Sequence, residues 1–220
     1  AHPTFIDAAV LIKKAAARVN SELGLLDKNK AQAIQQAADE ILTGKHRDQF
    51  IVDAYQAGAG TSHNMNVNEV LANRANQILG GKRGVYDLVH PNDHVNMSQS
   101  TNDVIPTALR IGGVLLWRKL DAALEELQKA LEKKSKEFDK IIKTGRTHLQ
   151  DATPIRLGQE FSGYAAAVQK GRKRIDQAVA GLRVLGIGGT AVGTGLNSHP
   201  QYRQKMPQVL SEWVGEKFTP

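Results

Sequence analysis

The stretch WRKLDAALEELQKAL, residues 117–131, decides the class of fold. Its large apolar residues follow one another at steps of three and four positions: Trp117, Leu120, Leu124, Leu127 and Leu131. Residues at this spacing lie on one face of an α-helix, as in helices that pack in a bundle or coiled coil. The pattern can run from about Val104 to Phe138, so it predicts one long helix with an apolar face to bury.

Helical spacing of apolar residues predicts five further helices: Phe5–Leu23, Asp27–Leu42, Asn68–Leu79, Ile155–Leu185 and Tyr202–Val214. Asp27 is typical of an N-cap, and Gly44 is typical of a helix end. Segments 56–65 and 90–102 have no period and are predicted to be loops, and no alternation typical of strands persists. The prediction is an all-α, long-helix bundle fold. We expect residues 1–98 to form a mainly helical N-terminal domain and residues 99–220 a central helical-bundle domain. Both should be partial, because two long helices do not close a bundle core.

The composition excludes several classes of protein. With 41% hydrophobic and 23% charged residues, the chain is an ordinary globular one, and without cysteine it has no disulfide and no thiolate site. Its net charge of +7 does not indicate nucleic-acid binding, because the lysines of residues 133–143 alternate with acidic residues and the basic run 170–174 has no aromatic neighbours. An anionic small substrate explains this sign of charge equally well. No apolar run approaches the roughly 20 residues that span a bilayer, so no membrane partner is expected.

Three polar clusters stand apart from the predicted apolar faces: Gly58–Asn66, Ser98–Asp103 and Thr144–Asp151. Each combines hydroxyls and amides, two of them with an imidazole, and such groups donate the hydrogen bonds that carboxylate oxygens require. Each cluster also has a structural interpretation. The first could be a loop whose side chains cap a helix, the second an N-cap with an acidic first turn, and the third a surface connection. No cofactor and no metal ion are expected, since the spacing of His90 and His94 across a proline does not resemble a metal site.

Together these clusters resemble the aspartase/fumarase superfamily. The matching stretches are GAGTSHNMNVNEVLANRA from Gly58, HPNDHVNMSQSTND from His90, GRTHLQDATPIRLGQEFSGY from Gly145 and GGTAVGTGLN from Gly188. The resemblance implies a cytoplasmic α-helical homotetramer whose active sites are each built from three subunits. It also implies an anti elimination that releases fumarate, with small dicarboxylates (L-aspartate, L-malate and fumarate) as the ligands.

The resemblance also implies roles for individual residues. Thr147 and His148 are expected to be catalytic. The same two residues, with Thr61, Ser100, Thr101 and Asn102, fall on the substrate-binding positions of the family. His90 and Asn92 fall where fumarases carry a second dicarboxylate site.

One element of the family is missing from these 220 residues. The family's catalytic serine lies on a loop with the pattern G-S-S-x-M-P-x-K-x-N, and no such stretch occurs here. We therefore expect the chain to be a fragment that is inactive alone, cut from a longer lyase.

The substrate is less clear than the family. Gly58–Ser62 and Ser100–Asn102 resemble aspartases, whereas His90–Asp93, Phe161–Tyr164 and Gly188–Thr190 are closer to fumarases. The substrate-contacting clusters favour L-aspartate, with L-malate as the alternative. A non-catalytic scaffold on a lyase fold is a further alternative.

Overall fold

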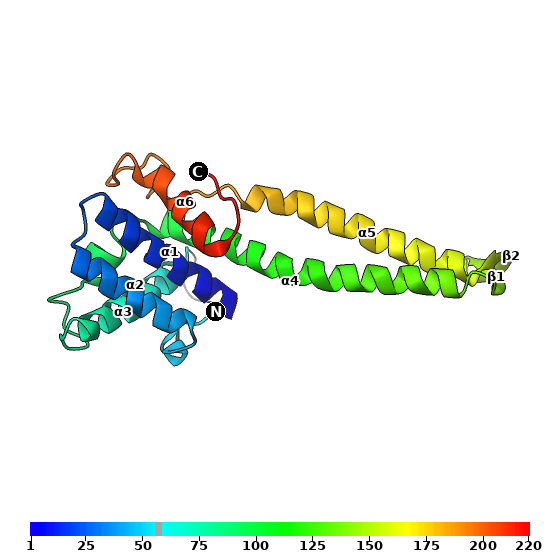
Figure 1. Cartoon of the computed structure of the whole chain (residues 1–220), viewed down its shortest axis with the longest axis horizontal. Coiled ribbons are helices and arrows are strands. Elements are labelled where there is room, and N and C mark those ends of the chain that lie inside the picture. The colour runs from blue at the N-terminus through cyan, green and yellow to red at the C-terminus, as the bar shows by residue number, and fades with distance from the viewer. Residues whose placement is uncertain (56–58) are drawn as a thin grey trace. The chain divides into compact units, whose positions relative to one another are not determined.

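The structure is a computed structural model that describes residues 1–55 and 59–220 and is mostly helical, which confirms the predicted fold class (Figure 1). The chain divides into two compact units, one of residues 1–114 with 182–220 and one of residues 115–181. The expected domains 1–98 and 99–220 do not coincide with these units. These domain boundaries stay a prediction.

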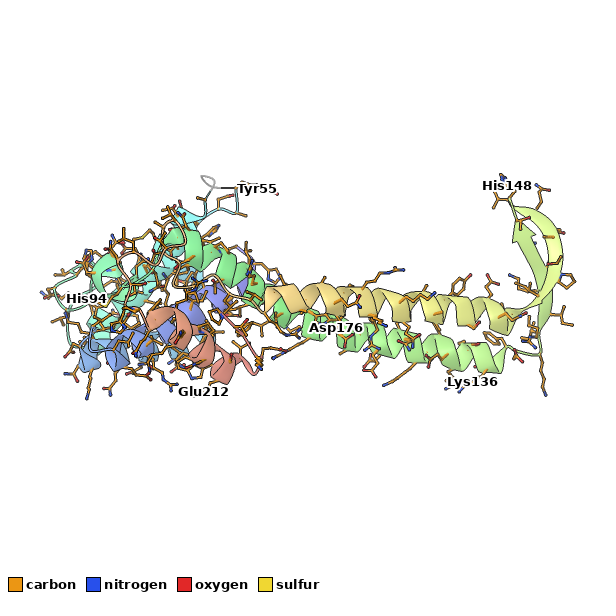
Figure 2. All side chains as sticks on the ribbon, turned by 90° about the horizontal axis from the view of Figure 1, so that it is seen from above. Tyr55, His94, Lys136, His148, Asp176 and Glu212 are labelled. Carbon is orange, nitrogen blue, oxygen red and sulfur yellow. The ribbon has the colours of Figure 1, made fainter. Side chains whose placement is uncertain are left out.

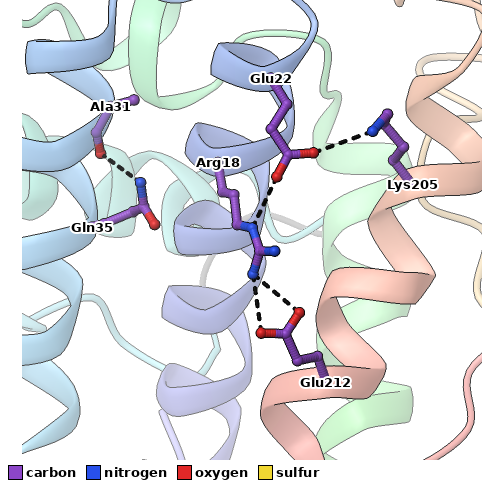
Figure 3. A network of polar contacts seen from close by, with 6 residues as sticks. All are labelled: Arg18, Glu22, Ala31, Gln35, Lys205 and Glu212. Atoms are coloured by element: carbon purple, nitrogen blue, oxygen red, sulfur yellow. Dashed lines mark hydrogen bonds and ion pairs between the residues drawn. The ribbon is translucent and has the colours of Figure 1, made fainter.

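The first unit is built around helix α1, Pro3–Glu22, which contacts α2 (Lys28–Leu42), α3 (Thr61–Ile78) and α6 (Tyr202–Val214). Five of its buried residues are alanines, and these small side chains let three helices approach the same helix closely. At the surface, Arg18 of α1 binds both carboxylate oxygens of Glu212 in α6, at 3.1 and 3.2 Å (Figure 3). Glu22 accepts from Arg18 at 3.0 Å and from Lys205 at 3.2 Å, so the ion pairs fasten α1 to α6.

Several helix ends lie where the sequence predicted them. Asp27 caps α2 as predicted, accepting from the backbone N–H groups of Asn29 and Lys30 at 2.9 and 3.1 Å. Helix α6 has the predicted bounds, and α1 and α2 differ from prediction by no more than two residues at either end.

Helix α3 begins at Thr61 rather than at Asn68, so the predicted loop 56–65 is wrong over its last five residues. Residues 56–58, including Gly58 of the first polar cluster, lie outside the described residues. The first turns of α3 were not predicted as helix because polar residues weaken the spacing of apolar residues on its buried face. Three of the seven buried residues of α3 are asparagines: Asn64, Asn68 and Asn76. Gly60 enters the helix with φ +79°, a conformation that favours glycine.

The second predicted loop, 90–102, also holds structure. Pro91–Val95 forms a short π-helical turn, η2, and the long helix α4 begins at Thr101 and ends at Glu137. The short 3₁₀ helix η1, Arg47–Gln49, lies in the connection between α2 and α3.

The second unit contains most of α4 and of α5, Leu157–Leu182, which lie side by side in opposite directions (Figure 1). Arg172 of α5 binds Asp121 of α4 at 2.8 and 3.1 Å. Near the other end, the Ser135 hydroxyl donates to the carbonyl of Gly158 at 2.8 Å. Leu120 and Leu127, part of the apolar face predicted from the sequence, remain 48% and 47% exposed in this chain.

A two-stranded antiparallel hairpin joins α4 to α5, which corrects the prediction that the chain has no strands. Strand β1 is Ile142–Thr147 and β2 is Gln150–Arg156, so the predicted start of the second long helix at Ile155 is also wrong. The ladder is irregular around Gly145. Most residues of both strands are exposed, so neither strand needs the alternation of apolar and polar residues by which strands are recognised.

Candidate active site

The start of α4 is a capping box made by two residues of the second polar cluster. The Ser100 hydroxyl accepts from the backbone N–H of Asn102 at 3.2 Å, and Oδ1 of Asp103 accepts from the backbone N–H of Ser100 at 2.9 Å. The capping interpretation of this cluster is therefore correct. It leaves the Ser100 hydroxyl proton available for donation to a ligand, because the oxygen acts only as an acceptor in the cap.

Asp103 also ties the glycine-rich segment to this helix start. Its Oδ2 accepts from the backbone N–H groups of Gly188 at 3.0 Å and Thr190 at 2.9 Å, and the residue is only 4% exposed. Asn102 donates from Nδ2 to the carbonyl of Ala191 at 2.8 Å, which leaves its Oδ1 as an acceptor. The stretch from Gly188 to Ala191 is thus held against the start of α4.

The start of α3 lies against the same turn of α4. A Cβ atom at Gly60 would lie 2.9 Å from Cγ1 of Ile105, so only glycine allows the two helix starts to approach this closely. Asn64, one turn after the exposed Thr61, donates from Nδ2 to the Thr101 hydroxyl at 3.1 Å. The structure therefore brings the first turn of α3, which begins at Thr61, close to the start of α4 with Ser100, Thr101 and Asn102. That these residues share one site stays a prediction.

A buried lysine lies behind these residues. Nζ of Lys13 donates to Oδ1 of Asn96 at 2.8 Å, and this oxygen also accepts from Nδ2 of Asn64 at 3.2 Å. Burial lowers the pKa of Lys13 to about 7, against the opposing effect of the negative charge of Asp103. The helix starts therefore have a titratable cation and a carboxylate beneath them.

Thr147 and His148 belong to the second unit, where Thr147 pairs with Gln150 at the end of the hairpin ladder. His148 lies at the turn of the hairpin (Figure 2). Both are exposed, and His148 and Leu149 have φ values of +51° and +60°. Two-residue hairpin turns with positive φ at both positions normally carry Asn or Gly, and a bulkier residue costs about 1 kcal/mol or more at each. Leu149 is also 93% exposed. Nothing in the second unit explains a strained, exposed histidine and leucine, and such positions often indicate function.

His90 and Asn92, the proposed second dicarboxylate site, lie together at the start of η2. Nδ1 of His90 accepts from the backbone N–H groups of Asn92 and Asp93 at 3.3 and 3.2 Å. The ring of His90 packs edge-on against Tyr86, with 5.8 Å between ring centroids. The histidine therefore has a structural role at this turn, and the exposed Asn92 side chain is next to it.

Comparison with known proteins places the chain in a family. A sequence model of the lyase family matches residues 4–219. Over 97% of its length the chain is 53% identical to the class II fumarate hydratase of Nitrosomonas europaea and 51% identical to the aspartate ammonia-lyase of Bacillus subtilis. It superimposes with a TM-score of 0.96 and 46% identity on the crystal structure of fumarate lyase:delta crystallin from Brucella melitensis bound to cobalt, covering 99% of this chain and 47% of that one.

The chain belongs to the lyase family of the aspartase/fumarase superfamily. It spans about half the length of the curated relatives it matches, 46% of the fumarate hydratase and 45% of the aspartate ammonia-lyase.

Three residues that surround the candidate site were given no role in the sequence analysis: Lys13, Asn64 of the first polar cluster, and Asn96 of the stretch from His90. Lys13 and Asn64 sit on buried helix faces. The sequence position of Lys13 could have indicated that it is buried. It follows Ile6 and Ala9 at helical spacing and thus falls on the apolar face of its helix. A charged residue on such a face is rare unless it is paired.

Among residues 1–55 and 59–220, no three side chains of His, Cys, Asp or Glu are grouped so that they could hold a metal ion. The expectation of no metal and no cofactor stays a prediction. None of the helices in this part of the chain has the length and apolar character that crossing a membrane requires.

Proposed function

We propose that the full-length protein is a lyase that reversibly releases fumarate by anti elimination, with L-aspartate as its substrate. The observation that carries this proposal is the pairing of two helix starts that present Thr61, Ser100, Thr101 and Asn102. These residues stand on the motifs by which the chain resembles aspartases and fumarases.

The chemistry of the elimination explains why such an arrangement is useful. A base removes a proton from Cβ, the neighbouring carboxylate becomes a doubly charged aci-carboxylate, and the amine then leaves with the electrons of its C–N bond. Hydroxyl and amide donors aimed at the developing charge stabilise this intermediate more than the substrate. The partial positive charge at the starts of α3 and α4 acts in the same direction.

Thr147 and His148 are proposed to complete the site from another subunit of a homotetramer. Their exposure at the tip of a hairpin supports this assignment, because they have no enclosing pocket of their own in the second unit. The half-exposed Leu120 and Leu127 support the assembly, since further helices packed on α4 would bury them. The missing serine loop would supply the base, so the 220-residue chain alone is proposed to be inactive. We also propose that the protein works in the cytoplasm.

L-Malate is the second candidate substrate. The stretch His90–Asp93 and the residues Gly188–Thr190 are closer to fumarases, and a fumarate hydratase is among the most similar relatives. His90 and Asn92 are then proposed to form the second dicarboxylate site. The substrate-contacting clusters, Gly58–Ser62 and Ser100–Asn102, resemble those of aspartases, and on them we base the choice of aspartate.

Fumarate's ultraviolet absorbance provides the test. The full-length protein is given L-aspartate in one cuvette and L-malate in another. A rise with aspartate alone supports the proposal, and a rise with malate alone replaces aspartate by malate. Absence of a rise with either substrate contradicts the proposed activity and favours a non-catalytic scaffold.

A further inference from the structure

A chain of three hydrogen bonds leads from the buried centre of α1 to the hydroxyl of Thr101. Lys13 Nζ donates to Asn96 Oδ1 at 2.8 Å, Asn64 Nδ2 donates to the same oxygen at 3.2 Å, and Asn64 Nδ2 also donates to Thr101 Oγ1 at 3.1 Å. Lys13 is 0% exposed and Asn64 is 2% exposed, so water does not compete for these bonds.

Lys13 determines which atom donates and which accepts in each of these three hydrogen bonds. In its protonated form Lys13 has only donors, so the carbonyl oxygen of Asn96 faces it. An oxygen accepts only, so the atom of Asn64 that faces it must be the amide nitrogen. Both protons of that nitrogen are then used, one on Asn96 and one on Thr101. The Thr101 oxygen must therefore accept, and its own proton is left for a different partner.

Burial of the Asn64 side chain destabilises the fold unless its amide donors form hydrogen bonds. Its Oδ1 is buried and has no hydrogen-bond partner, and an unpaired buried polar atom destabilises a fold. The other residues around it on the buried face of α3, Val67 and Leu71, fill space without that penalty. An apolar side chain would leave no buried oxygen unpaired, so the two donors are what asparagine contributes at this position.

We propose that Asn64, oriented by Asn96 and Lys13, is a positioning residue that holds the Thr101 hydroxyl as a hydrogen-bond donor toward a substrate carboxylate. This inference rests on the proposed function, because it assumes that Thr101 contacts a dicarboxylate. Asn64 itself does not need to touch the substrate.

The test compares Asn64→Leu and Asn64→Asp with the wild-type full-length protein, using fumarate release. Leucine removes the donor, and aspartate reverses it, because a carboxylate would accept the Thr101 proton. Each variant is expected to lower kcat/KM about 10- to 100-fold, the range for loss of a hydrogen bond to a charged group. Unchanged kcat/KM in a folded Asn64 variant overturns the proposal.

Asn68→Leu is the matched control, since Asn68 is fully buried one turn further along the same helix and its amide donates only to Met65 Sδ at 3.5 Å. It should leave kcat/KM within about twofold of wild type. An equal loss in Asn68→Leu would mean that any buried change in α3 disturbs the site, and would overturn the specific role of Asn64. If Asn64→Leu does not fold, Asn96→Ala tests the same series of hydrogen bonds at a half-buried position. A smaller loss of kcat/KM is expected for this variant, and an unchanged kcat/KM would count against the proposal.

A double-mutant cycle separates positioning from a general structural effect. In a Thr101→Val background, Asn64→Leu should cause no further loss, because the hydroxyl it orients is gone. Losses that multiply would overturn the proposal.

Binding of succinate, measured by calorimetry, distinguishes this inference from the proposed function. If the wild type binds succinate without releasing fumarate from either substrate, the proposed function fails, and weaker binding by Asn64→Leu but not by Asn68→Leu still supports the inference. If the wild type neither reacts nor binds succinate, both fail.

Discussion

Replacing Lys13 by methionine should change how the stability of the protein depends on pH. Burial lowers the pKa of Lys13 from 10.5 to about 7 in the folded protein, while the unfolded chain keeps the higher value. Between these two values the unfolded state binds a proton that the folded state has released. On account of this group, the free energy of unfolding therefore rises with pH across this window and is constant below it.

The size of the effect follows from the two pKa values. From pH 7 to pH 9 the wild type should gain about 2 kcal/mol in the free energy of unfolding relative to Lys13→Met, approaching about 1.4 kcal/mol per pH unit at the upper end. The attraction between Lys13 and Asp103 is already contained in the pKa of about 7, so the loss of the bond to Asn96 is the separate offset in the variant.

Chemical unfolding followed by circular dichroism, at fixed protomer concentration and at pH 7, 8 and 9, measures this difference. Lys13→Gln is the matched control, because glutamine keeps a donor but does not titrate, and it should show the same relative trend as methionine. A difference between wild type and Lys13→Met that stays constant over this range, or that moves in favour of the variant, would refute the assignment of a buried, titrating lysine.

Three other changes test other parts of the account, each in the full-length protein. His148→Ala should lower kcat while size-exclusion chromatography still shows the wild-type assembly; an unchanged rate would remove His148 from the site. Leu127→Asp should break the assembly, because it would bury an unpaired charge in the apolar face of α4; light scattering that shows the wild-type mass would contradict this. Gly158→Ala should lower stability by about 1–3 kcal/mol, because the added Cβ would lie 2.7 Å from Cα of Asp139, and an unchanged melting temperature would contradict the close packing.

Long helices were predictable because their signal is local and repeated. The steps from Trp117 to Leu131 indicated α4, and Asp27 marked the start of α2, since both patterns depend only on neighbours in sequence. The helix ends next to the hairpin were predicted within two residues, since α4 ends one residue before Phe138 and α5 begins two residues after Ile155. The hairpin itself was missed because it is exposed and polar. Its turn is formed by His148 and Leu149 at positive φ, which residue preferences do not favour.

The candidate site was predictable in part for a different reason. Its hydroxyls and amides stand in motifs that resemble a family, and the structure brings the two clusters of the first unit together. The residues behind them were not predictable, because Lys13, Asn64 and Asn96 come from segments far apart in the chain and meet only after folding. The polar side chain of Asn64 also lowered the helical signal of the start of α3.

The reverse reaction in deuterated water tests the central claim most directly. The full-length protein is incubated with fumarate, with and without ammonium, and the product is identified by nuclear magnetic resonance. The account predicts aspartate in the presence of ammonium, with a single deuterium at Cβ, added on the face opposite to the nitrogen. Malate formed in both samples would replace aspartate as the substrate. Deuterium on the same face as the nitrogen, or no product at all, would contradict an anti elimination at this site.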